Sequence, residues 1–135
     1  MKMLLIYPSW PKLDRQKEFH LPPHGPVVFA ATVPAEVELT FVDDNLQPLD
    51  FDAKPDLVGI SIMLTCQVPR ALAIADQFRA RGVPVICGGI ATMLHADEVG
   101  RHADSVFLGE TEGRFASVVA DFKAGRLQRV YNYMD

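Results

Sequence analysis

Long hydrophobic runs are missing from this sequence. No apolar stretch reaches the ~20 residues that a transmembrane helix needs, so we expect no membrane span. The apolar start, residues 1–8, is too short for the core of a signal peptide and lacks a small-residue cleavage site. We therefore interpret this segment as a first β-strand.

Cysteine is scarce as well. The two thiols, Cys66 and Cys87, form neither a metal-binding motif nor a disulfide pattern. Their scarcity fits a reducing, cytoplasmic compartment. We expect both side chains to be buried as small apolar groups.

A clustered basic segment is also lacking. Lys and Arg number 13 against 17 Asp and Glu, and the two signs are interspersed. Because phosphate binding needs a concentrated basic face, we expect no nucleic-acid partner.

What is present is an ordinary globular composition, with 49% apolar and 22% charged residues. The length of 135 residues suits one domain, and no repeat or internal linker divides it. We therefore expect residues 1–135 to form a single domain.

Short apolar segments alternate with helical patterns along the chain. Continuous apolar runs are typical of parallel strands that are buried on both faces. Helical spacing, together with Pro69 near a helix start and Gly82 and Gly125 as stops, marks the intervening helices. The expected strands are 3–7, 37–42, 57–62, 83–87 and 105–108, and the expected helices are 27–33, 71–81, 95–101 and 113–123.

This alternation predicts an α/β domain, a doubly wound five-stranded parallel sheet with helices on both faces. Residues 8–26 and 45–56 are expected to be loops. The tail, residues 129–135, is either a short edge strand or a linker.

The ligand site of such a fold lies at the carboxyl ends of the strands. Small, polar or flexible residues follow the strands there, and glycines among them let a ligand approach the backbone. Each also has an ordinary structural role to offer: Gly88 and Gly89 as a tight turn, Ser61 and Thr65 as helix caps, Glu110 as a first-turn acid. Only their joint arrangement favours a site.

Several ligand classes are disfavoured by missing motifs. No G-x-G-x-x-G follows the first strand, and no Walker lysine motif exists, which argues against dinucleotides and nucleoside triphosphates. The acid pair Asp43–Asp44 lacks the phosphorylatable aspartate that a receiver domain carries after its third strand. A flavin site would need a phosphate-cradling loop within residues 8–26, where hydroxyls and glycines are too sparse.

Several motifs lie in register at these strand ends. They are Pro-Pro-His-Gly-Pro at 22–26, Asp-Leu-Val-Gly-Ile-Ser-Ile-Met-Leu-Thr at 56–65, Pro-Val-Ile-Cys-Gly-Gly at 84–89 and Val-Phe-Leu-Gly-Glu-Thr-Glu at 106–112. Together they resemble the cobalamin-binding domain of radical S-adenosylmethionine enzymes, and the resemblance runs the whole length of the chain. It implies a flavodoxin-like (Rossmann-like) fold, with the corrin over the carboxyl edge and the nucleotide tail in a slot.

The resemblance also implies which residues bind cobalamin. The tail slot is expected from Ser61, Met63 and Thr65, with the tail passing close to the backbone at the glycine pair. The full expected set is Pro23, His24 and Gly25 beside the corrin; Ser61, Met63, Leu64 and Thr65; Gly88, Gly89, Ile90, Ala91 and Thr92; and Gly109, Glu110 and Thr111 on the far wall.

The chain departs from related patterns in informative ways. It has no D-x-H-x-x-G, so cobalt has no protein ligand from that motif, although His20 and His24 remain as candidates. Ala91 stands where many relatives have histidine. The alternative function is therefore a degenerate docking or structural domain that no longer binds cobalamin.

A second absence concerns catalysis. The C-x-x-x-C-x-x-C motif that holds a 4Fe–4S cluster is missing. We therefore expect the cluster, S-adenosylmethionine and a methyltransferase-like barrel to belong to a radical S-adenosylmethionine domain that follows residue 135, and the alternative is a stand-alone carrier. The chain alone is then a binding module rather than a catalyst.

Overall fold

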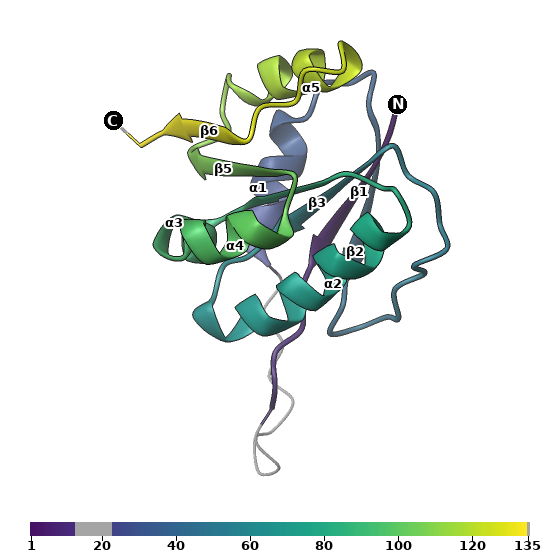
Figure 1. Cartoon of the computed structure of the whole chain (residues 1–135), viewed down its shortest axis with the longest axis vertical. Helices are drawn as coiled ribbons and strands as arrows, with labels where there is room; N and C mark the ends of the chain where they lie inside the picture. The colour runs from purple at the N-terminus through teal and green to yellow at the C-terminus, as the bar shows by residue number, and fades with distance from the viewer. Residues whose placement is uncertain (13–22, 135) are drawn as a thin grey trace.

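A computed structural model describes residues 1–12 and 23–134. In these residues, one parallel sheet of six strands runs in the order β2-β1-β3-β4-β5-β6 (Figure 1). The parallel α/β architecture is as predicted. The strands are β1 (Lys2–Tyr7), β2 (Glu38–Asp43), β3 (Leu57–Ser61), β4 (Val85–Gly88), β5 (Ser105–Gly109) and β6 (Val130–Tyr133).

The sheet has six strands and not the predicted five, because the tail forms β6 at the edge beside β5, which is the edge-strand alternative left open for residues 129–135. Its register pairs Phe107 with Tyr131. Only Tyr131 of this strand is buried, so the segment carries no apolar run that marks it as a strand. The Tyr131 ring stacks on Phe107, and its hydroxyl donates a 2.9 Å hydrogen bond to Asp121. The contacts that anchor β6 therefore come from residues distant in sequence.

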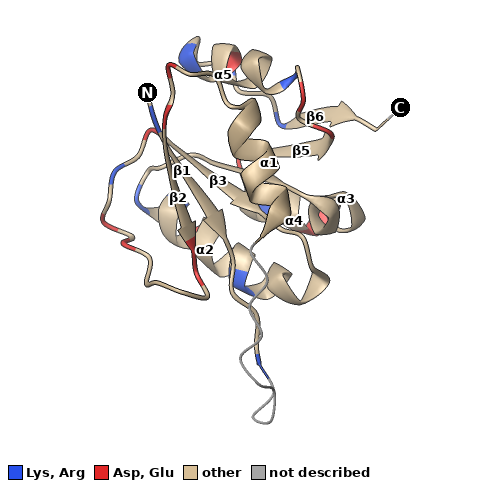
Figure 2. Cartoon of the chain, turned by 180° about the vertical axis from the view of Figure 1, so that it is seen from behind, with Lys and Arg blue, Asp and Glu red and all other residues tan. Residues whose placement is uncertain are grey.

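Helices cover both faces of the sheet, as predicted. Figure 1 views the face that carries α2 and α4, and Figure 2, the reverse view, brings α1 to the front. One face carries α1 (His24–Thr32) and α5 (Phe115–Lys123); the other carries α2 (Val68–Ala80), α3 (Ile90–Leu94) and α4 (Ala96–His102), with a 3₁₀ turn at Thr65–Gln67 before α2.

The short helix α3 was not predicted, since only a single helix over 95–101 was expected. Gly89 turns the chain with φ +100°, and α3 begins at the next residue. The glycine pair thus makes the tight turn that the sequence allowed, and a helix follows it with no loop between them.

Side chains of each strand alternate between two cores. Leu4, Ile6, Val58 and Ile60 pack under α2, α3 and α4, where Phe78 of α2 is fully buried. The other face collects, under α1 and α5, Met3, Leu57, Ile86, Phe107, Phe115, Val118 and Val119. The three buried residues of α5, which are Phe115, Val118 and Val119, therefore belong to this second core.

The two cysteines have different environments. Cys87 is buried in the sheet, and burial raises the pKa of its thiol to about 12. Cys66 is exposed, so its predicted burial is wrong, because the segment after β3 lies on the outer surface.

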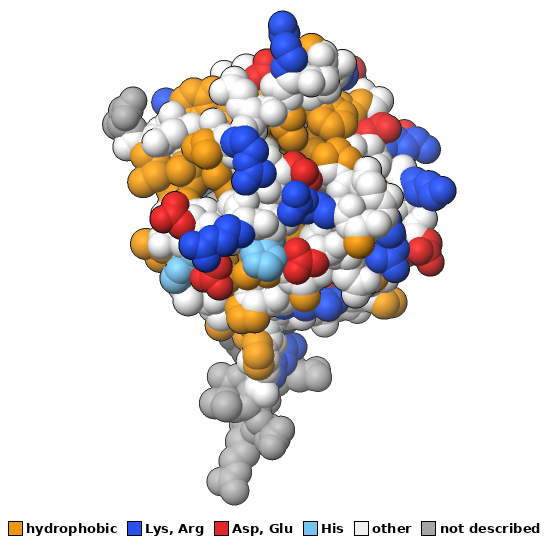
Figure 3. All heavy atoms as spheres, viewed as in Figure 1, with side chains coloured by type: hydrophobic (Ala, Val, Ile, Leu, Met, Phe, Trp, Pro, Cys, Tyr) orange, Lys and Arg blue, Asp and Glu red, His pale blue; other side chains and the backbone are white. Residues whose placement is uncertain are grey.

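Figure 3 shows basic and acidic side chains mixed over the face of α2 and α4. Among the described residues, no helix is long and apolar enough to cross a membrane.

Candidate functional site

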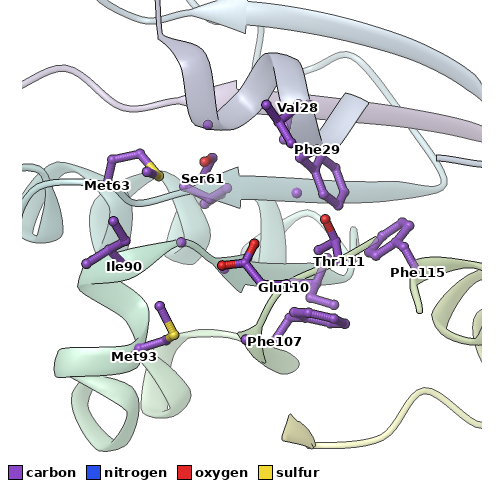
Figure 4. A pocket seen from close by; sticks show the side chains of 18 of the residues that line it. Val28, Phe29, Ser61, Met63, Ile90, Met93, Phe107, Glu110, Thr111 and Phe115 are labelled. Atoms are coloured by element: carbon purple, nitrogen blue, oxygen red, sulfur yellow. The ribbon is translucent and has the colours of Figure 1, made fainter. Parts of the chain in front are cut away.

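A cleft of about 380 Å³ opens at the carboxyl ends of β3, β4 and β5 and runs inward between α1 and the sheet (Figure 4). We call it the α1 cleft. Its inner end is lined by buried apolar side chains and its mouth by polar and flexible ones. The lining residues are Met3, Leu5, His24, Gly25, Val28, Phe29, Gly59, Ile60, Ser61, Met63, Ile86, Gly88, Gly89, Ile90, Met93, Phe107, Gly109, Glu110, Thr111, Glu112 and Phe115.

The cleft exists because small residues replace large ones on this face of the sheet. Gly59, Ser61 and Gly88 all lie on it, and Ser61 and Gly88 are direct neighbours across β3 and β4. A Cβ added at Gly59 would lie 2.6 Å from the Met3 methyl carbon, so a side chain there would enter the cleft wall. Because alternate residues of a strand share one face, these three small residues lie side by side under α1 and leave space there.

Gly88 and Gly89 lack a side chain for different structural reasons. At Gly89 φ is +100°, and a Cβ would lie 2.5 Å from the carbonyl oxygen of Ile62. A glycine is needed there by the backbone turn, so the ordinary turn interpretation is correct for Gly89. A Cβ at Gly88 would meet Phe107 at an ordinary 3.7 Å. The missing side chain at Gly88 therefore widens the cleft without being needed by the fold.

The structure brings together most of the predicted site residues. Those that line the α1 cleft are His24, Gly25, Ser61, Met63, Gly88, Gly89, Ile90, Gly109, Glu110 and Thr111.

The other predicted residues lie outside the lining. Pro23 directly precedes α1. Leu64 and Thr65 are exposed beyond the mouth, and Thr65 Oγ1 lies 3.2 Å from His95 Nε2. Ala91 and Thr92 are buried behind the turn, where the Thr92 hydroxyl donates to the Gly88 carbonyl at 2.9 Å.

Sequence reasoning missed the inner end of the cleft. Residues in the middle of strands and on α1 were interpreted as core. A glycine two positions before Ser61, within an apolar strand, was the available signal, because both residues share one face. The missed lining residues are Met3, Leu5, Val28, Phe29, Gly59, Ile60, Ile86, Met93, Phe107, Glu112 and Phe115.

Ser61 supplies a buried hydroxyl to the cleft. The residue is 8% exposed and belongs to β3, so it caps no helix. Its hydroxyl makes no hydrogen bond to another described residue and reaches the open space of the cleft, where water would otherwise be its partner. A ligand in the cleft would supply that partner.

Gln67 fixes the loops at the mouth. Its side chain is fully buried, and its Oε1 accepts hydrogen bonds from the backbone N–H groups of Met63 at 3.0 Å and Leu64 at 2.9 Å. The Met63 thioether in turn packs against α1, since a Cβ at Gly25 would lie 2.8 Å from its sulfur. The Gln67 amide therefore holds the loop at the mouth in place, and the Met63 thioether closes the mouth on one side.

The acid pair after β2 serves the structure. Arg70 donates to Asp44 at 2.8 and 3.0 Å, and the Ser9 N–H donates at 3.0 Å. Burial opposes ionisation of Asp44, but these hydrogen bonds outweigh it and lower its pKa. Asp44 therefore anchors the segment after β1 to α2.

A protein-bound metal has little support in the described part of the chain. No group of three or more His, Cys, Asp or Glu side chains there could hold an ion. His24 lines the mouth and is exposed, whereas His20 lies outside the described residues.

Residues 18–119 match the model of the B12 binding domain family. This chain belongs to that family. The matched span contains α1, β3, β4 and β5, which build the α1 cleft. Vitamin B12 is cobalamin, the cofactor that the sequence resemblance implied.

Two curated relatives are methyltransferases of Chlorobaculum tepidum. Bacteriochlorophyllide d C-8(2)-methyltransferase is 30% identical over 80% of this chain, and bacteriochlorophyllide d C-12(1)-methyltransferase is 29% identical over 78%. The match covers 24% of the length of each relative. No solved structure matches the chain.

The cleft residues fit the nucleotide tail of cobalamin. The volume of about 380 Å³ lies in the range of small-molecule sites. Glycines allow close approach to the sheet, buried apolar side chains suit a planar base, and the Ser61 hydroxyl is available to an acceptor on it.

Proposed function

We propose that this domain binds cobalamin, with the nucleotide tail in the α1 cleft and the corrin over the carboxyl edge of the sheet. The observation that carries the proposal is the hollow at Gly59, Ser61 and Gly88, which lies at the edge of the sheet where the resemblance places the tail.

The chain's own residues bind and orient the cofactor. Ser61 donates a hydrogen bond to the base, and the aromatic side chains at the inner end enclose it and exclude water. Met63 and His24 lie at the mouth, beside the corrin. When bound, cobalamin supplies a cobalt that can carry a methyl group, and the protein contributes binding and orientation. The candidate protein ligands of cobalt are His20 and His24.

We further propose that the domain works in a methyltransferase-like radical S-adenosylmethionine enzyme of the cytoplasm. The whole-length resemblance and the names of the two relatives support this. In that arrangement the 4Fe–4S cluster and S-adenosylmethionine belong to a catalytic domain after residue 135. The domain alone binds cobalamin and turns nothing over.

The test is incubation of the chain with hydroxocobalamin, followed by gel filtration. We expect corrin absorbance to elute with the protein at concentrations well above micromolar. The Gly88→Leu variant places a large side chain in the cleft and should elute without corrin. Gly100→Ala is the matched control, because Gly100 lies in α4 on the opposite face and a Cβ there meets only Val106, at 3.9 Å.

Protein that elutes without corrin would count against the proposal. Gly88→Leu that binds as well as Gly100→Ala would show that the tail lies elsewhere. If Gly88→Leu leaves the activity of a full-length enzyme intact, the docking or structural function is favoured.

A further inference from the structure

The described side chains at the inner end of the α1 cleft are apolar, apart from Thr111 at its edge. β1 contributes Met3 and Leu5, which are 1% and 2% exposed, and β4 contributes Ile86. Phe29 of α1 packs edge-to-face on Phe115 with ring centroids 4.6 Å apart. The backbone groups of the floor are used in the sheet ladder. A planar ring inserted here meets hydrocarbon on both faces.

Few polar side chains line the cleft, and most of them lie towards its mouth. The Ser61 hydroxyl is buried beside Gly88, and Figure 4 shows Thr111 on the side of Phe29 and Phe115. Glu110 and Glu112 are exposed at the mouth. Among the described lining residues, the cleft therefore offers two hydroxyls and no side-chain amide to a ring at its inner end, and the charged groups lie at the mouth.

Natural corrinoids differ in the base that ends the nucleotide tail. Dimethylbenzimidazole has one ring nitrogen left to accept a hydrogen bond once the other is bonded to ribose, and the rest of the ring is hydrocarbon. Adenine has several ring nitrogens and an exocyclic amine. A polar group buried without a partner loses its bonds to water and weakens binding.

We propose that the α1 cleft selects corrinoids whose lower base is a benzimidazole over those whose lower base is a purine. The inference rests on the proposed function, since it requires the tail to enter this cleft. The Ser61 hydroxyl alone can satisfy the single free acceptor of a benzimidazole, whereas Ser61 and Thr111 together are too few for the several ring nitrogens and the amine of adenine. The amine and additional nitrogens of a purine find no matching set of partners among the described residues.

The test measures the affinity of the chain for three corrinoids by titration of the visible absorbance. They are hydroxocobalamin, its analogue with adenine as lower base, and cobinamide, which has no base. We expect hydroxocobalamin to bind at least ~10-fold more tightly than the adenine analogue, which corresponds to about 1.4 kcal/mol. Cobinamide should bind most weakly, because it leaves the cleft unfilled.

Equal affinity for hydroxocobalamin and the adenine analogue would overturn the inference and leave the proposed function standing. Absence of binding by all three would overturn both. The two failures are therefore distinguishable in one experiment.

A pair of valines on α1 locates the effect. Val28 lines the cleft, whereas Val27 is 58% exposed and does not. Val28→Asn adds an amide to the cleft and should reduce the preference for hydroxocobalamin at least ~3-fold, or about 0.6 kcal/mol. Val27→Asn is the control and should keep the wild-type preference. An unchanged preference in Val28→Asn, or an equal change in both variants, would contradict a base located in the α1 cleft.

Discussion

The side-chain amide of Gln67 donates a 2.7 Å hydrogen bond to the carbonyl oxygen of Pro8, 59 residues away in sequence. The same buried side chain accepts two backbone N–H groups from the loop after β3. One residue thus joins the ends of β1 and β3 at the mouth of the α1 cleft. Its exchange would leave three backbone groups without their partner.

Gln67→Ala should therefore destabilise the fold by roughly 1–3 kcal/mol, the cost of leaving a buried polar group unpaired. It should also weaken cobalamin binding, because Met63 would lose its fixed position. Urea unfolding and absorbance titration measure the two effects. Gln47→Ala is the control, since Gln47 is exposed. Equal unfolding midpoints for the two variants would refute the role of Gln67.

The adjacent glycines Gly88 and Gly89 should respond differently to alanine. Gly89→Ala combines a left-handed backbone with a Cβ 2.5 Å from the Ile62 carbonyl oxygen, so we expect a loss of more than ~2 kcal/mol of stability. Gly88→Ala has room and should cost less than about 1 kcal/mol. Thermal or urea unfolding of the two variants checks this. A larger loss at Gly88 would contradict the distinction between turn and cleft.

Asp44 should contribute pH-dependent stability. Its folded-state pKa is lowered, so the contribution is fully present above the ordinary aspartate pKa of about 4 and is lost as pH falls through the lowered value. Wild type should therefore exceed Asp44→Asn in stability at pH 7, and the difference should shrink towards pH 3. Urea unfolding at several pH values measures it. Asp97→Asn, at an exposed position, is the control. A difference independent of pH would refute the ion pair with Arg70.

The two thiols should label at very different rates. Cys66 is exposed and should react with a thiol reagent in the native state, whereas Cys87 is buried, with a pKa raised to about 12, and should react only on unfolding. Labelling stoichiometry with and without urea measures this. Cys66→Ser should remove the native-state reaction. Labelling that persists in Cys66→Ser would place Cys87 at the surface.

The sequence by itself determined five of the six strands, their parallel arrangement and the edge of the sheet at which the candidate site lies. Continuous apolar runs such as 57–62 bury both faces of a strand, and this local pattern suffices for the prediction. Ser61, Gly88 and Gly109 follow or end such strands, so topology alone places them at one edge.

Only the tertiary structure decided the depth of the site and its limits. The cleft is lined by Leu5, Phe29 and Phe107 because α1 packs over a part of the sheet where the side chains are small. That packing depends on residues far apart in sequence. Ala91 and Thr92 lie outside the cleft lining, because α3 begins directly after Gly89 and its geometry buries both side chains in the core. Strand β6 likewise forms through the contacts of Tyr131 with Phe107 and Asp121. The alternation of residues along a strand determines which face of the sheet a side chain lies on. The space left on that face depends on which helix packs against it.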